Sequence, residues 1–220
     1  MPYTLFGSTE EHAEDTERRV YGVAIAEVVN NRDLEQTGSV QVRYPWLPGI
    51  EPWARLAVPM AGDGRGMYFI PQEKEEVLVA FSQGDVAAPY VIGSLWNGKD
   101  RPPARELTDP VSTRMIRTPA GHELTFDDLK RSITIATPMG HKITVGPDKV
   151  EIADDKTATH RITLDKSGIT LEAKKGDIAL QAPLGSVKIK ARRVEIRSTS
   201  GTEVKAGGQC VVKGAVVRIN

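Results

Sequence analysis

The sequence predicts an all-β protein with two parts, a small barrel followed by a repetitive β-ribbon. Two observations predict it. Between residues 20 and 96, about five short runs alternate apolar and polar residues and are separated by Gly, Pro, Asn and Asp. After residue 122, apolar pairs at i and i+2 return about every 8 residues, from Ile133/Ile135 to Val217/Ile219. Alternation with period 2 indicates strands with one dry and one wet face.

The ribbon carries only two apolar residues per strand and almost no aromatic bulk. One copy therefore has no second layer on which to bury its dry face. We expect three identical ribbons to wind together into a prism, each strand passing to the next side, so that inward residues meet on a threefold axis. The fold class predicted for this part is an intertwined triple-stranded β-helix, a homotrimeric needle.

The residues assigned to the trimer core share the inward parity of these pairs. They are Ile133, Ile135, Ile143, Val145, Val150, Ile152, Ile162, Leu164, Ile169, Leu171, Ile178, Leu180, Val187, Ile189, Val194 and Ile196.

The first part is predicted to be a closed barrel of the oligonucleotide/oligosaccharide-binding (OB) type. Its expected strands start at Val23 and continue in the runs 38–44, 53–60, 67–70, 76–81 and 89–95. OB barrels often bind nucleic acid, but residues 21–93 hold nine acids and five bases and no basic stripe. Because phosphate neutralisation dominates nucleic-acid affinity, we expect no nucleic-acid partner.

A set of aromatic, proline and glycine positions in this part forms a recognisable signature. The signature residues are Tyr44, Pro45, Trp46, Trp53, Pro59, Gly66, Tyr68, Pro71, Asp85, Pro89, Gly93 and Trp96. With their neighbours they resemble the OB domain of central-spike proteins of contractile injection systems. These are the valine-glycine repeat protein G (VgrG) family of type VI secretion and the baseplate assembly protein V family of contractile-tailed phages. The resemblance covers roughly residues 20–105.

The resemblance implies a short spike form in four parts. These are an acidic segment contacting a hub protein (1–20), the OB domain (21–96), a Pro-rich linker (97–116) and the trimeric β-helix spike (117–220). It implies a structural protein at the end of an inner tube that punctures a target envelope. A separate hub joins it to the tube. The chain end lacks the His-x-His apex of some phage spikes, which implies a PAAR-type tip protein contacting Val217, Arg218, Ile219 and Asn220.

No residue pattern indicates catalysis or a cofactor. The pairs Asp127-Asp128 and Asp154-Asp155 fall at turns without a nucleophile, and the glycines at 62, 64 and 66 lack the strand-to-helix context of a dinucleotide loop, so we read them as a barrel turn. We therefore expect that the protein is not an enzyme. The three tryptophans are expected in the barrel core or in barrel-to-barrel contacts, with a carbohydrate platform as the weaker alternative.

Three histidines, His122, His141 and His160, lie 19 residues apart. Their parity matches the inward residues, so three chains would bring rings of histidine to the axis, where a metal or anion could bind. The favoured alternative places them at prism corners, bonded to backbone carbonyls. No metal site is assigned firmly.

Charge and cysteine content bear on location. Residues 166–220 hold eleven bases and four acids, charges that keep a sheet edge soluble or, alternatively, attract an anionic envelope surface. With no long apolar run or leader, and Cys210 as the single cysteine, we expect assembly in the cytoplasm. The protein would then belong to a phage-tail-like particle or secretion apparatus delivered to a target envelope. The competing function is an OB module for nucleic acid or polysaccharide on a trimerisation stalk.

Overall fold

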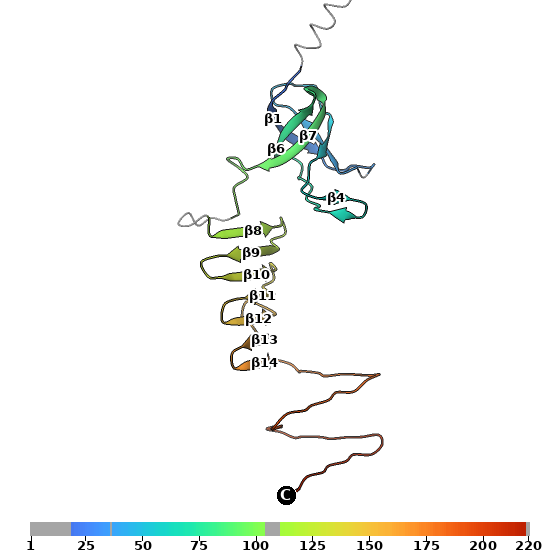
Figure 1. Ribbon diagram of the computed structural model, residues 1–220, viewed down its shortest axis with the longest axis vertical. Helices are drawn as coiled ribbons and strands as arrows, with labels where there is room; N and C mark the ends of the chain where they lie inside the picture. Colours follow the sequence, from blue (N-terminus) through green and yellow to red (C-terminus); the bar gives the residue numbers. More distant parts are fainter. Residues whose placement is uncertain (1–18, 36, 104–110, 219–220) are drawn as a thin grey trace, which may run out of the picture.

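The computed structural model describes residues 19–35, 37–103 and 111–218, and these ranges contain strands but no helix. Figure 1 shows a barrel, a stack of strands, and an extended segment that leads to the C-terminus. The all-β prediction is confirmed. In the described part of the chain, no helix is long and apolar enough to cross a membrane.

The barrel is closed by five strands in the order β1-β2-β3-β7-β6, with β6 returning to β1. The strands are β1 (Val23–Asn30), β2 (Ser39–Arg43), β3 (Trp53–Leu56), β6 (Glu76–Ser82) and β7 (Asp85–Leu95). All neighbours are antiparallel except β3 and β7, which run parallel. A five-stranded barrel of this kind is an OB-like fold, as predicted.

Small side chains fill the barrel because its interior is narrow. The buried cluster consists of Ala26, Val28, Val40, Val42, Tyr44, Ala54, Val77, Val79 and Val91. The expectation that the tryptophans belong to this core is wrong for the single chain. Trp46, Trp53 and Trp96 remain 45%, 44% and 69% exposed.

A two-stranded hairpin leaves the barrel between β3 and β6. It consists of β4 (Ala61–Gly62) and β5 (Arg65–Gly66), so the glycine-rich turn lies outside the barrel rather than in it. Gly66 has φ +151°, and a Cβ there would lie 2.6 Å from the carbonyl oxygen of Met60, so only glycine fits. The predicted strand at 67–70 does not form, since after Met67 the run leaves the hairpin and reaches Pro71, which has no N–H to donate.

The second part is a seven-stranded antiparallel meander in which each strand pairs with the next. Its strands are β8 (Thr113–Arg117), β9 (Glu123–Asp127), β10 (Ser132–Ala136), β11 (Lys142–Val145), β12 (Lys149–Ala153), β13 (His160–Asp165) and β14 (Gly168–Ala173). The sheet therefore includes residues 113–116, the last four residues of the predicted linker. Consecutive strands stay in one sheet over residues 113–173, so the expected passage to the next side of a prism does not occur there.

Residues 174–218 form no strand in the single chain, although their apolar pairs predict several. Figure 1 shows this segment as extended runs joined by bends, well separated from one another. A β-strand exists only when a neighbour completes its hydrogen-bond ladder, and no strand among the described residues pairs with this segment.

Candidate functional site

The apolar face of the meander is the most distinctive surface in the described residues. Cross-strand register aligns its side chains into two continuous columns. The first column is Ile116, Leu124, Ile135, Ile143, Ile152, Ile162 and Leu171. The second is Arg114, Phe126, Ile133, Val145, Val150, Leu164 and Ile169. The predicted core residues from Ile133 to Leu171 all lie in these columns.

None of these column residues is buried in the single chain, and most of them are exposed. Exposed fractions are 51% for Ile135, 41% for Ile152, 51% for Leu171 and 76% for Ile169. Water contact of this kind along a whole sheet face is unfavourable by roughly 25 cal/mol for each Å². An exposed apolar face of this extent is typical of an interaction surface.

A hollow of about 570 Å³ lies on the same face near its lower end. The isoleucines of the first column form its floor, and His141, His160 and Asp177 lie among its polar lining. Ile178, from the segment that follows β14, also lines it. The extended segment therefore begins against the apolar face.

The opposite face has a column of threonines that the sequence analysis missed. Thr125, Thr134 and Thr144 stand opposite one another on successive strands, followed by Glu151 and then by Thr163 and Thr170. The repeated triplet apolar–Thr–apolar was the signal that could have revealed this column. Threonine suits a half-buried pleated surface and hydrogen-bonds across strands.

Ion pairs reinforce this polar face. Glu151 accepts from Lys149 at 2.5 Å and lies 4.0 Å from Arg161, which in turn contacts Glu172 at 2.6 Å. The hydrogen bond from Lys149 lowers the pKa of Glu151, and that from Arg161 lowers the pKa of Glu172. One face is thus ionic and hydroxylated, and the other is hydrocarbon.

Polar residues mark the upper end of the apolar face. Arg114 occupies the first position of the second column and pairs with Asp128 at 2.5 Å. The hydrocarbon of the second column therefore begins at Phe126 of β9, whereas the first column begins at Ile116 on the edge strand β8.

Each of the three histidines closes a turn at the side of the sheet. The N–H of Thr118 donates to the carbonyl of His122, and the N–H of Thr137 donates to that of His141, at 2.9 and 3.0 Å. At the third turn Asp154 replaces threonine and accepts from the backbone N–H of His160 at 2.9 Å. The structure thus places all three at turns beside the sheet. Within the described residues, no group of three or more His, Cys, Asp or Glu side chains is arranged to hold a metal ion.

His160 is held at both ring nitrogens. Nδ1 contacts a carboxylate oxygen of Asp154, and Nε2 lies 2.5 Å from the carbonyl oxygen of Lys175. Because neither partner can donate a proton, the doubly protonated ring satisfies both. The hydrogen bond to Asp154 accordingly raises the pKa of His160.

The OB signature residues divide between core and surface. Tyr44 is buried, its hydroxyl donates to the carbonyl of Val86 at 2.8 Å, and its ring packs on Trp46 and Phe81. Burial raises the pKa of Tyr44 to about 12. The buried prolines are Pro71 and Pro89, and the exposed signature residues are Pro45, Trp46, Trp53, Pro59, Gly66, Tyr68, Asp85, Gly93 and Trp96.

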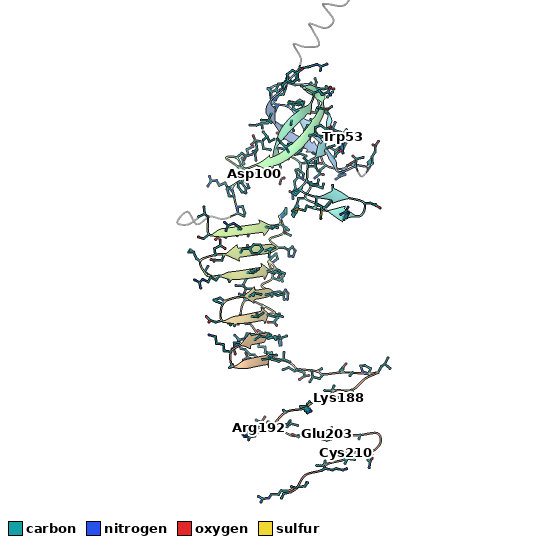
Figure 2. All side chains as sticks on the ribbon, in the orientation of Figure 1. Trp53, Asp100, Lys188, Arg192, Glu203 and Cys210 are labelled. Atoms are coloured by element: carbon teal, nitrogen blue, oxygen red, sulfur yellow. The ribbon has the colours of Figure 1, made fainter. Side chains whose placement is uncertain are left out.

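The β2–β3 face is where OB barrels usually bind ligands. Trp53 is exposed there on the outside of the barrel (Figure 2). The nearby Arg43, however, contacts Glu51 at 2.6 Å and lies 4.0 Å from Glu27. Two carboxylates neutralise the cation that a phosphate would need, which disfavours the nucleic-acid alternative.

The residues predicted to contact a tip protein are only partly described. Val217 is 51% exposed and Arg218 is exposed. Ile219 and Asn220 lie outside the described residues, as do residues 1–18 of the acidic segment predicted to contact a hub.

Comparison with known proteins agrees with the barrel geometry. Residues 24–96 match the family described as the type VI secretion system/phage-baseplate injector OB domain. This range spans all five barrel strands except the first residue of β1, and the resemblance to spike proteins of contractile injection systems is confirmed.

Curated proteins that are similar to this chain include spike proteins of type VI secretion systems. The type VI secretion system spike protein VgrG2a of Pseudomonas aeruginosa is 29% identical over 132 residues, covering 54% of this chain. Type VI secretion system spike protein VgrG3 and actin cross-linking toxin VgrG1, both of Vibrio cholerae, are each 30% identical over 125 residues, covering 50% of this chain. The chain spans only 16%, 12% and 11% of the length of VgrG2a, VgrG3 and VgrG1.

Proposed function

Since its barrel is an injector OB domain and it is similar to spike proteins, we propose that this chain is the central spike of a contractile injection system. In this proposal three copies form a homotrimer at the end of the inner tube and puncture a target envelope. The observation that carries the proposal is the apolar face of the meander, two aligned hydrocarbon columns left uncovered in a single copy.

A threefold arrangement covers all three apolar faces with one kind of contact. Each copy supplies one sheet over residues 113–173, with the isoleucine columns inward and the threonine column outward. Below β14, the backbone of 174–218 has no ladder partner in its own chain, so in the trimer it pairs with strands of its neighbours. The intertwined part of the needle is thereby assigned to residues 174–218 alone.

The proposed role is mechanical and involves no catalysis. Strands of the meander stack along the long axis of the molecule (Figure 1), and six steps of ~4.8 Å give a sheet about 29 Å tall. Ladder hydrogen bonds then run along the direction of thrust, and an axial load is shared among them.

The proposed partners follow from the resemblance. A hub protein joins the barrel end to the tube, and a PAAR-type protein caps the end at residues 217–220. The particle assembles in the cytoplasm before delivery to the target envelope.

The test uses two aspartate variants on adjacent residues of β10. Ile135 lies in an inward column and Thr134 on the opposite face. Ile135→Asp places three carboxylates together on a dry axis, so we expect light scattering to show loss of the trimer and tagged protein to leave the contractile particles. The control variant Thr134→Asp should keep the trimer and should remain in the contractile particles. Retention of the trimer by Ile135→Asp, or absence of the unmodified chain from particles containing sheath and tube, would contradict the proposal.

A further inference from the structure

Charge changes abruptly where the meander ends. Residues 113–173 carry nine bases and nine acids, whereas residues 174–218 carry ten bases and three acids. In the meander five of the nine bases form ion pairs with carboxylates, as in the pairs Lys130–Asp127, Lys149–Glu151 and Arg161–Glu172. The lower segment is therefore a cationic extension of a neutral sheet.

Half of these bases lie within ten residues. We call Lys188, Lys190, Arg192, Arg193 and Arg197 the basic band; all five are exposed, and Figure 2 shows Lys188 and Arg192 on the extended segment beyond β14. Glu195 is the single acid among residues 186–198, and it is shared by Arg193 and Arg197. Among the described residues, Lys188, Lys190 and Arg192 contact no carboxylate.

Alternation separates the band from the apolar residues beside it. Lys188 and Lys190 alternate with Val187 and Ile189, and Arg193 and Arg197 share a parity opposite to Val194 and Ile196. When the apolar residues turn inward, these four bases turn outward, and Arg192 lies at the bend between the two runs. The inference rests on the proposed trimer, in which three copies bring fifteen bases to one short length of the needle.

The composition of the segment selects among anionic partners. Proteins that bind single-stranded nucleic acid combine a basic groove with aromatic side chains on which bases stack. Residues 174–218 contain no Phe, Tyr or Trp. What remains is dense positive charge on a stalk, which suits the headgroup phosphates of an anionic bilayer.

We propose that the basic band binds the phosphate-bearing surface of an anionic membrane. This contact would hold the needle at the target surface before thrust, and it requires no particular lipid stereochemistry. Charge attraction of this type weakens steeply with ionic strength.

The experiment measures co-sedimentation of the full-length chain with vesicles of phosphatidylcholine alone or with one quarter phosphatidylglycerol. We expect binding to the anionic vesicles at 150 mM NaCl, with at least a roughly tenfold loss at 500 mM. The variant Lys188→Ser/Lys190→Ser/Arg192→Ser should lose binding by about tenfold or more. The control Lys130→Ser/Lys142→Ser/Lys166→Ser removes the same charge from the neutral sheet and should bind like the unmodified chain.

Light scattering on each sample separates this inference from the proposed function. A trimer that ignores anionic vesicles overturns the membrane inference and leaves the spike proposal intact. Equal loss in the two triple variants, or tighter binding to duplex DNA than to vesicles, also overturns it.

Discussion

At the scale of single residues, Tyr44 and His160 show how the chain uses polar groups. Tyr44 is the largest fully buried side chain among the described residues, and its hydroxyl is satisfied by one backbone carbonyl. His160 is exposed yet joins a turn to the following segment through both ring nitrogens. One side chain packs in the barrel core, and the other connects the turn before β13 to Lys175, just after β14.

We expect Tyr44→Phe to lower the free energy of unfolding of the barrel by about 1 kcal/mol, the usual net value of a buried neutral hydrogen bond. Urea titration followed by tryptophan fluorescence measures it, because Trp46 stacks on the Tyr44 ring. Tyr68→Phe is the control, since Tyr68 is 83% exposed and should change nothing. Equal effects in the two variants would contradict the role given to Tyr44.

A pH dependence follows from His160. Its pKa is raised in the folded state by Asp154, so its stabilising contribution is complete below its unfolded pKa near 6.5 and is lost as pH rises through the folded value. The pKa of Asp154 is lowered, mainly by the backbone N–H of His160, so its contribution disappears at acid pH as the folded value is passed.

Thermal melting of His160→Gln should therefore differ most from the unmodified chain near pH 5, and the difference should shrink above the raised pKa. The other charged groups near the ring, Asp155, Arg161 and Asp177, are retained in both proteins. A difference that grows with pH would show that the pair is not an ionic contact.

At the scale of elements, period-2 alternation predicted most of the sheet. The pairs from Leu124/Phe126 to Ile169/Leu171 each became one strand from β9 to β14, because every strand has the same two inward positions. The alternation did not predict strand β8, because Arg114 occupies a position where the other strands have an apolar residue. The hairpin β4–β5 was not predicted either, because strands of two residues are too short to show alternation.

Local pattern also left the connectivity open. Short turns are compatible both with a meander and with passage around a prism, and hydrogen-bond register alone distinguishes them. For residues 174–218 the pattern of apolar pairs is as regular as in the meander, but no strand forms there in the single chain, and we propose that neighbouring copies supply the ladder partners. The tryptophan side chains lie on the outside of the barrel because its narrow interior has no space for them.

Hydrogen exchange tests the assignment of the lower segment. Backbone amides of residues 178–216 should be protected in the assembled protein and should exchange rapidly in Ile135→Asp, since protection there depends on neighbouring chains. Amides of β1 and β6 in the barrel should stay protected in both proteins and serve as the internal control. Rapid exchange of 178–216 in the unmodified protein would refute the intertwined needle.

At the scale of the whole molecule, the proposed trimer couples the stability of the meander and the lower segment to assembly. The barrel has its own small core, whereas the meander places its hydrocarbon columns in water and the lower segment lacks ladder partners. In the proposed trimer, the columns leave water and the lower segment gains ladder partners only when copies associate. A rod made this way is stiff along its axis, which is the property a puncturing spike needs.

Sedimentation equilibrium of the unmodified chain in dilute solution is the most direct measurement of this account. We predict a single species of 72 kDa, three times the 24.0 kDa of one chain, that persists on dilution. A well-ordered species of 24.0 kDa would contradict it, because the apolar face would then be stable without partners.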